Sequence, residues 1–234
     1  MRKYLATLGL GIPLLFQGTP AFGEQVFWGV QVEQFEYRLG EGSGNALAWD
    51  FDALVGNDNL KFVWRSEAEY ATHEEAFEAL ENQARLQVPI STFFDAVVGV
   101  RVETPRGQDR LDGVVGVHGL AEQWFEVDAD LFVSENPSAR FEVEYEGLIT
   151  NYLILTPSIE MNLPFNDDPD REVGAFGPQL ELGLRLSYDI VDRLLSPYVG
   201  VHYERLFGDT ADIAEADGKD DDAVFGVVGL KMMF

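Results

Sequence analysis

Histidine and carboxylate side chains in this chain share the spacing of residues on one face of a strand. His202 and Glu204 are two residues apart, and in an extended strand residues i and i+2 project to the same side. His118 and Glu126 flank a short turn predicted at residues 121–123, so we expect their side chains to approach each other. Imidazole nitrogen and carboxylate oxygen are ligands for divalent transition metals. The pattern therefore makes these residues candidate metal ligands.

The segments that carry these residues alternate between apolar and polar side chains. Leu182, Leu184 and Leu186 share one face of such a segment, while Glu181 and Arg185 share the other. From residue 24 onward this period of two dominates, and helical periodicity is scarce. We predict about twelve strands, at residues 26–39, 46–56, 59–71, 75–89, 92–104, 110–121, 123–134, 138–149, 152–164, 178–191, 196–208 and 222–234.

The charge on the second face distinguishes two folds that both alternate. A soluble sandwich usually has shorter strands and leaves its charged side chains on an outer surface with edges to protect. A transmembrane barrel has no edges, turns its apolar face to lipid and encloses its polar face in a lumen. Here the second face is charged in one long segment after another. The sequence therefore predicts an all-β fold: a closed antiparallel transmembrane β-barrel of the outer-membrane type.

The connections between the predicted strands alternate in length. Short turns alternating with longer loops are typical of an outer-membrane barrel whose two termini lie on the periplasmic side. The phase of the alternation also changes within the first predicted strand, which indicates a β-bulge near Glu33. The short turns are predicted at residues 56–59, 89–92, 121–123 and 148–152, and the notably long loops at residues 164–177 and 208–222.

The two ends of the chain carry the pattern of an exported outer-membrane protein. A basic start at Arg2 precedes an apolar run at residues 4–16 that is too short to span a bilayer, and small residues end at Gly23. We therefore predict a signal peptide at residues 1–23 and a barrel domain at residues 24–234, with a buried N-terminal helix as the alternative. The last residues, VVGLKMMF, resemble the C-terminal signal that the outer-membrane assembly machinery recognises.

Composition excludes several classes of protein. The chain has 41 acidic and 16 basic residues and a net charge of −25, which argues against nucleic acid as a partner because phosphates require Lys and Arg. It contains no cysteine, which is compatible with an oxidising envelope and excludes thiolate chemistry. Beyond the N-terminus it has no apolar run of about twenty residues, so transmembrane helices are not expected.

An ordered set of segments resembles the copper resistance protein B family (CopB/PcoB). The family stretch GLAPYWFEVEA is similar to GLAEQWFEVDA at residues 119–129, and the family stretch GLRLRYEI is similar to GLRLSYDI at residues 183–190. These and the remaining matches cover essentially the whole predicted barrel domain. The remaining matches are WRSEAE at residues 64–69, EYEGLITNYLILTP at 144–157, PYVGV at 197–201 and FGDTAD at 207–212.

The resemblance implies an outer-membrane protein of copper resistance that binds copper ions or allows them to cross the outer membrane. It further implies outer-membrane lipid, copper ions and a periplasmic multicopper oxidase as partners. Many members of the family carry a His- and Met-rich segment ahead of the barrel. Here we expect the barrel to begin directly after the signal peptide, so we expect that segment to be missing.

Two interpretations of the predicted lumen stay open. In the first, arginines and carboxylates pair across neighbouring strands and fill a narrow lumen with ion pairs and water. In the second, histidine and carboxylates form a lumen site for Cu(II), which accepts nitrogen and oxygen ligands. The candidate copper ligands are His118, His202, Glu204, Glu126, Glu67 and Glu69.

Two other functions are alternatives to copper resistance. An acidic lumen would also suit a cation-preferring outer-membrane channel without copper specificity, because it attracts positive solutes. An enzyme is not expected: His73 has no evident nucleophile beside it, and we find no glycine-rich phosphate loop and no nucleophile elbow. Two acidic segments, residues 166–170 and 217–222, lack the spacing of a calcium loop, so we expect solvated loops there.

Overall fold

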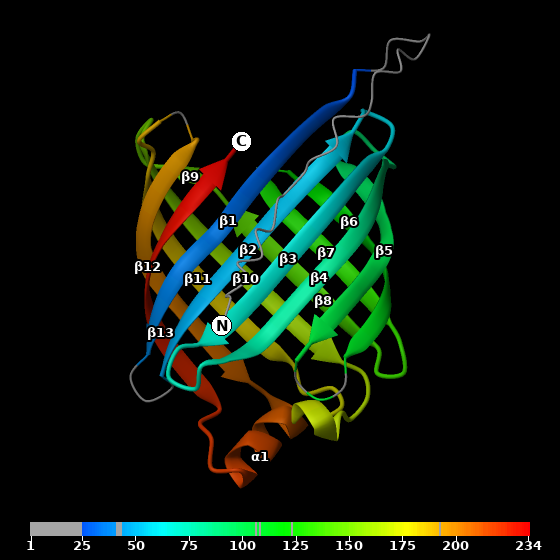
Figure 1. The fold of residues 1–234 in the computed structure, drawn as a ribbon, viewed down its shortest axis with the longest axis vertical. Coiled ribbons are helices and arrows are strands. Elements are labelled where there is room, and N and C mark those ends of the chain that lie inside the picture. Colours follow the sequence, from blue (N-terminus) through cyan, green and yellow to red (C-terminus); the bar gives the residue numbers. More distant parts are fainter. Residues whose placement is uncertain (1–24, 41–43, 106, 108, 123, 192) are drawn as a thin grey trace, which may run out of the picture.

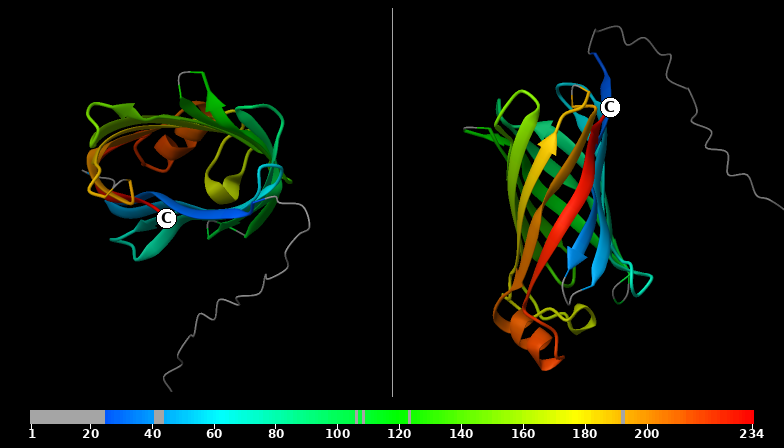
Figure 2. Two further views of the ribbon diagram at one scale, coloured as in Figure 1. Left: turned by 90° about the horizontal axis from the view of Figure 1, so that it is seen from above. Right: turned by 90° about the vertical axis from the view of Figure 1, so that its left-hand side faces the viewer.

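The chain folds into one closed antiparallel β-barrel (Figures 1 and 2). The structure is a computed structural model that describes residues 25–40, 44–105, 107, 109–122, 124–191 and 193–234. The predicted fold class is confirmed. The predicted signal peptide at residues 1–23 lies outside the described residues.

Along the wall, each strand pairs antiparallel with the strand that follows it in the barrel, as β10 does with β11. The pairing of β1 with β13 joins the first strand to the last and closes the cylinder. β8 and β9 both pair with β10, so they act as one barrel strand that is interrupted at Glu146, and the residues that the structure describes form a barrel of twelve strands. The strands are β1 (Phe27–Gly40), β2 (Asn45–Gly56), β3 (Lys61–Ala71), β4 (Ala76–Pro89), β5 (Phe94–Thr104), β6 (Arg110–Ala121), β7 (Phe125–Val133), β8 (Ser138–Tyr145), β9 (Gly147–Leu148), β10 (Leu153–Pro164), β11 (Gln179–Tyr188), β12 (Leu195–Leu206) and β13 (Asp222–Met233).

Alternation along each strand separates an apolar outer wall from a polar inner wall. On β5, Val98 and Val100 are 53% and 47% exposed on the outside, whereas Arg101 is only 4% exposed inside. A soluble protein would bury the valines and expose the arginine. The inverse arrangement is favourable in a bilayer, because hydrocarbon covers the outer side chains and the lumen supplies water and ion partners to the inner ones.

The β-bulge predicted near Glu33 is confirmed. The register between β1 and β2 shifts between Val32 and Gln34, so Glu33 is the extra residue of β1. The shift explains why the apolar face changes phase within this strand. A second irregularity, between Glu69 and Tyr70 where β3 pairs with β4, was not predicted.

The two ends of the barrel differ in their connections. β1 begins and β13 ends at one end, where the predicted short turns lie (Figure 1). The connections from β3 to β4 and from β7 to β8, at the opposite end, are also short, so the predicted alternation in length holds only in part. The opposite end carries a 3-10 helix, η1 (Pro169–Arg171), and an α-helix, α1 (Gly208–Ala216). Among the described residues, no helix is both long and apolar enough to cross a membrane.

The helix α1 corrects two predictions. The strand predicted at 196–208 ends at Leu206, and the loop predicted at 208–222 begins with this helix instead. Its residue Thr210 is buried, and its hydroxyl donates a hydrogen bond to the carbonyl oxygen of Gly177 at 2.7 Å. A contact with a residue so distant in sequence leaves no local signal.

The loop at residues 165–178 corrects another prediction, because it is not simply solvated. Asp168 is buried and accepts a hydrogen bond from Arg110 of β6, while Arg171 of η1 forms an ion pair with Glu103 of β5. These contacts draw the loop from β10 across to β5 and β6. Seen from above in Figure 2, η1 lies within the outline of the barrel.

Candidate metal and cation site in the lumen

The lumen contains a polar cavity of about 380 Å³. Fourteen carboxylate side chains and five arginines are among the residues that line it. Each arginine neutralises one negative charge, so the carboxylates leave an excess of negative charge in the cavity. Such a cavity concentrates cations by electrostatic attraction.

The strand register aligns many of these carboxylates in two acidic rows. Like charges directly opposite each other on neighbouring strands destabilise a sheet, so each row needs cations beside it. The first acidic row crosses β7, β8, β10, β11 and β12 and consists of Asp128, Glu142, Glu160, Glu181 and Glu204. The second acidic row crosses β2, β3, β4 and β5 and consists of Asp50, Glu67, Glu81 and Glu103.

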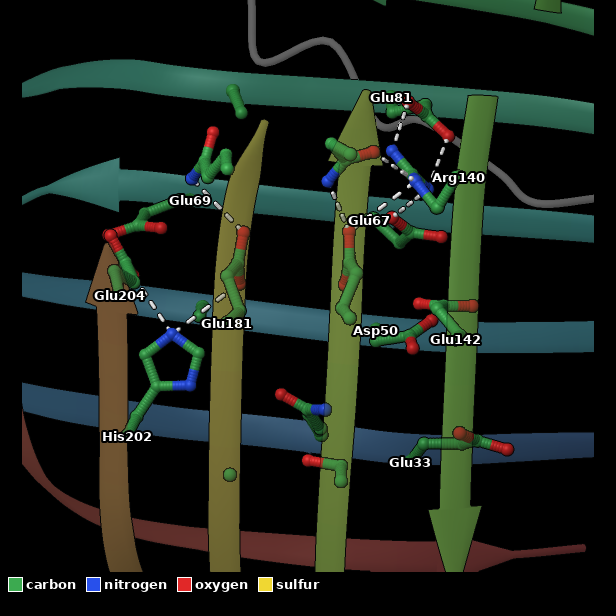
Figure 3. A pocket seen from close by; sticks show the side chains of 18 of the residues that line it. Glu33, Asp50, Glu67, Glu69, Glu81, Arg140, Glu142, Glu181, His202 and Glu204 are labelled. Atoms are coloured by element: carbon green, nitrogen blue, oxygen red, sulfur yellow. Dashed lines mark hydrogen bonds and ion pairs between the residues drawn. The ribbon is translucent and has the colours of Figure 1, made fainter. Parts of the chain in front are cut away.

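Arginines connect the two acidic rows across the lumen. Arg140 of β8 donates hydrogen bonds to Glu67 at 2.8 Å and to Glu81 at 3.0 Å (Figure 3). Arg65 of β3 forms an ion pair with Asp128 of β7 at 3.4 Å. The predicted ion pairing is therefore confirmed, but several pairs join opposite walls rather than neighbouring strands.

His202 lies at the end of the first acidic row, between two of its carboxylates (Figure 3). Its Nε2 atom is 2.9 Å from Oε1 of Glu204 and 3.5 Å from Oε2 of Glu181, and its side chain is 5% exposed. Ligand atoms that each lie about 2 Å from one ion are roughly 3 Å apart. Within the part of the chain that the structure describes, this group meets the spacing of a metal site, with its ligand atoms all within 4.8 Å of one another.

Arg38 of β1 contacts the same group. It donates hydrogen bonds from Nη1 to Oε1 of Glu204 and to Oε2 of Glu69, both at 3.1 Å, and from Nε to Glu36 at 3.0 Å. Glu69, a predicted ligand, is therefore held by Arg38. Glu67, another predicted ligand, is held by Arg140.

His118 has a different surrounding. The register pairs it with Asp128 rather than with Glu126, and its Nδ1 is 2.8 Å from Oδ2 of Asp128. Asp128 is also held by Arg85 at 2.9 Å. Of the six predicted ligands, His202 and Glu204 are the two that the structure places in one compact group.

Two residues were not predicted as part of this site: Glu181, which belongs to the group, and Arg38, which contacts it. Alternation assigns Glu181 to the polar face of its strand, but its position opposite Glu204 depends on the register between β11 and β12. Arg38 lies on β1, which comes near β12 because β13 pairs with both strands in the closed barrel. Neither relation leaves a signal in the local sequence.

Comparison with known proteins identifies the family. A family model described as copper resistance protein B precursor (CopB) matches residues 26–234. The chain belongs to the copper resistance protein B family. The copper resistance protein B homolog of Pseudomonas syringae pv. tomato is 37% identical over 193 residues, which cover 82% of this chain and 65% of that protein. Copper resistance protein B of Escherichia coli is 33% identical over 220 residues, which cover 93% of this chain and 73% of that protein.

Two further facts follow from the comparisons. The chain spans slightly less than two thirds of the length of the Pseudomonas relative of the copper resistance protein B family. The NanC porin is a structural neighbour with a TM-score of 0.58 and 11% identity, covering 87% of this chain and 98% of that one, a likeness that shows the fold alone. Family and fold together locate the protein in the outer membrane, as the sequence predicts.

Proposed function

We propose that this member of the copper resistance protein B family binds copper ions in its lumen or allows them to cross the outer membrane. The observation that carries the proposal is the group of Glu181, His202 and Glu204, which ends an acidic row inside the barrel. The group offers one imidazole nitrogen and two carboxylate oxygens. The negative charge of the surrounding cavity raises the local concentration of cations at this group.

The donor atoms favour Cu(II) over Cu(I). Imidazole and carboxylate suit Cu(II), whereas Cu(I) prefers thiolate and thioether ligands. Met161 lies on the outer wall with 37% exposure, and Met233 is the last residue of β13, at the end of the barrel. We further propose that outer-membrane lipid surrounds the barrel and that a periplasmic multicopper oxidase is its partner.

Replacement of each inward-facing histidine tests the proposal. We expect His202→Asn to weaken Cu(II) binding to the purified barrel about tenfold or more. We expect it also to remove the nitrogen coupling from the electron paramagnetic resonance spectrum of bound Cu(II). His118→Asn is the matched control, because Asp128 already holds His118. Cu(II) binding that neither replacement changes would contradict a histidine-containing copper site in the lumen.

A second candidate function is a cation-preferring channel without copper specificity. The excess of carboxylates over arginines in the cavity favours it. Growth of a deletion strain over a range of copper concentrations separates the two functions. The copper proposal predicts growth that depends on copper, whereas the channel predicts the same growth at each concentration. Neither proposal gives the protein a catalytic step.

A further inference from the structure

One oxygen atom in the lumen has two partners. Oε1 of Glu204 lies 2.9 Å from Nε2 of His202 and accepts a hydrogen bond from Nη1 of Arg38 at 3.1 Å. A metal ion bound to this oxygen and to His202 would share the oxygen with the guanidinium of Arg38, a second positive charge at hydrogen-bond distance. The guanidinium and the ion therefore compete for the same carboxylate.

We propose that Arg38 is an internal counter-cation that Cu(II) displaces from Glu204, so that the group of Glu181, His202 and Glu204 is an exchange site rather than a permanent one. The inference rests on the proposed function and adds the means by which its site is regulated. When copper is absent, the guanidinium of Arg38 supplies the positive charge beside the carboxylate of Glu204. When copper binds, the same charge lowers the affinity of the site for the ion.

The contacts of Arg38 allow such an exchange without unfolding of the wall. Its Nε is bound to Glu36, which is itself fully buried and held by Arg185 and by the hydroxyl of Tyr198, each at 2.9 Å. The stem of Arg38 is therefore fixed, while its Nη1 end bridges two carboxylates. When Glu204 binds a metal ion, Nη1 keeps its second partner, Glu69, so no buried charge is left alone.

The surroundings of His202 also favour a labile site. Metal-binding histidines in tightly held sites donate their second ring N–H to a carboxylate or carbonyl oxygen. Within the described part of the chain, Nδ1 of His202 is buried without a hydrogen-bond partner. A ligand that lacks this support holds its metal ion less firmly, as expected for an ion that binds and leaves again.

Removal of the charge of Arg38 tests the exchange. We expect Arg38→Met to bind Cu(II) about tenfold more tightly or better, because one positive charge no longer repels the ion at short range. Arg38→Lys keeps the charge and should stay close to the wild type. The matched control is Arg101→Met, since Arg101 also joins several carboxylates, Glu81, Glu103 and Asp112, but lies on β5, away from β11 and β12.

Cu(II) titration of the folded barrels in detergent gives the affinity, and electron paramagnetic resonance reports whether His202 is a ligand. Tighter binding by Arg38→Met alone, with nitrogen coupling that is lost in Arg38→Met/His202→Asn, supports the exchange. Affinity that Arg38→Met leaves unchanged or lowers, while His202→Asn still abolishes binding, overturns the exchange and leaves the proposed function standing. Absence of a His202-dependent Cu(II) signal in both the wild type and Arg38→Met overturns both.

Discussion

Charged side chains inside this barrel depend on partners that come from distant strands. Arg85 is fully buried and forms an ion pair with Asp128 at 2.9 Å and with Asp130 at 3.1 Å. Buried ions lose their hydration, and the attraction of a partner offsets that loss only while both members of the pair are present. The effect of these ion pairs on stability is therefore largest when one partner is removed.

Arg140 provides the clearest test at this scale. Arg140→Met leaves Glu67 and Glu81 opposite each other without their shared guanidinium. We expect the free energy of unfolding to fall by about 3 kcal/mol, measured by urea unfolding of the barrel in lipid vesicles. The control is Arg193→Met, because Arg193 is 47% exposed in its pair with Glu146 and such pairs contribute little. Equal stability of the two variants would contradict this account.

The loop at residues 165–178 is the element that distinguishes the two ends of the barrel. Ion pairs of Arg171 with Glu103 and of Arg110 with Asp168 hold it against β5 and β6. The hydroxyl of Thr210 joins it to α1. The loop lies at the end of the barrel opposite the start of β1 and the end of β13, and η1 lies within the outline of the barrel (Figures 1 and 2).

Release of this loop should widen the path through the barrel. We expect Arg171→Met to raise the single-channel conductance in planar bilayers, because the loop loses its anchor to Glu103. Lys219→Met is the matched control, since Lys219 also contacts this loop, at Glu172, but both side chains of that pair are about half exposed. A conductance that is the same in Arg171→Met and in the wild type would show that the loop does not limit the path.

At the scale of the whole molecule, the closed wall separates two kinds of surface. Hydrocarbon contacts the apolar outside, and the acidic cavity lies inside a wall that the pairing of β1 with β13 closes. We expect an open lumen to prefer cations, so that the reversal potential across a KCl gradient has the sign of potassium selectivity. The preference should weaken at high salt, where ions screen the carboxylates. A reversal potential of the opposite sign would contradict the electrostatic argument.

Local patterns in the sequence were sufficient for the strands and for the two faces of each strand. Alternation follows from the period of two of an extended chain, so it assigned Glu181 and Arg185 to the inside before any partner was known. The bulge at Glu33 was also predictable, because an extra residue moves the apolar side chains after it to the other set of alternate positions. The helix α1 was not, since its buried Thr210 depends on Gly174 and Gly177 far away in the chain.

The sequence by itself therefore determined that this protein is an outer-membrane barrel with an acidic interior, and it named His202 and Glu204 as neighbours on one strand. The tertiary structure decided which residues complete that pair. Glu181 meets His202 through the register of β11 against β12, and Arg38 reaches Glu204 because closure brings β1 beside β13. Register and closure depend on pairing between whole strands, and for that reason no single segment encodes them.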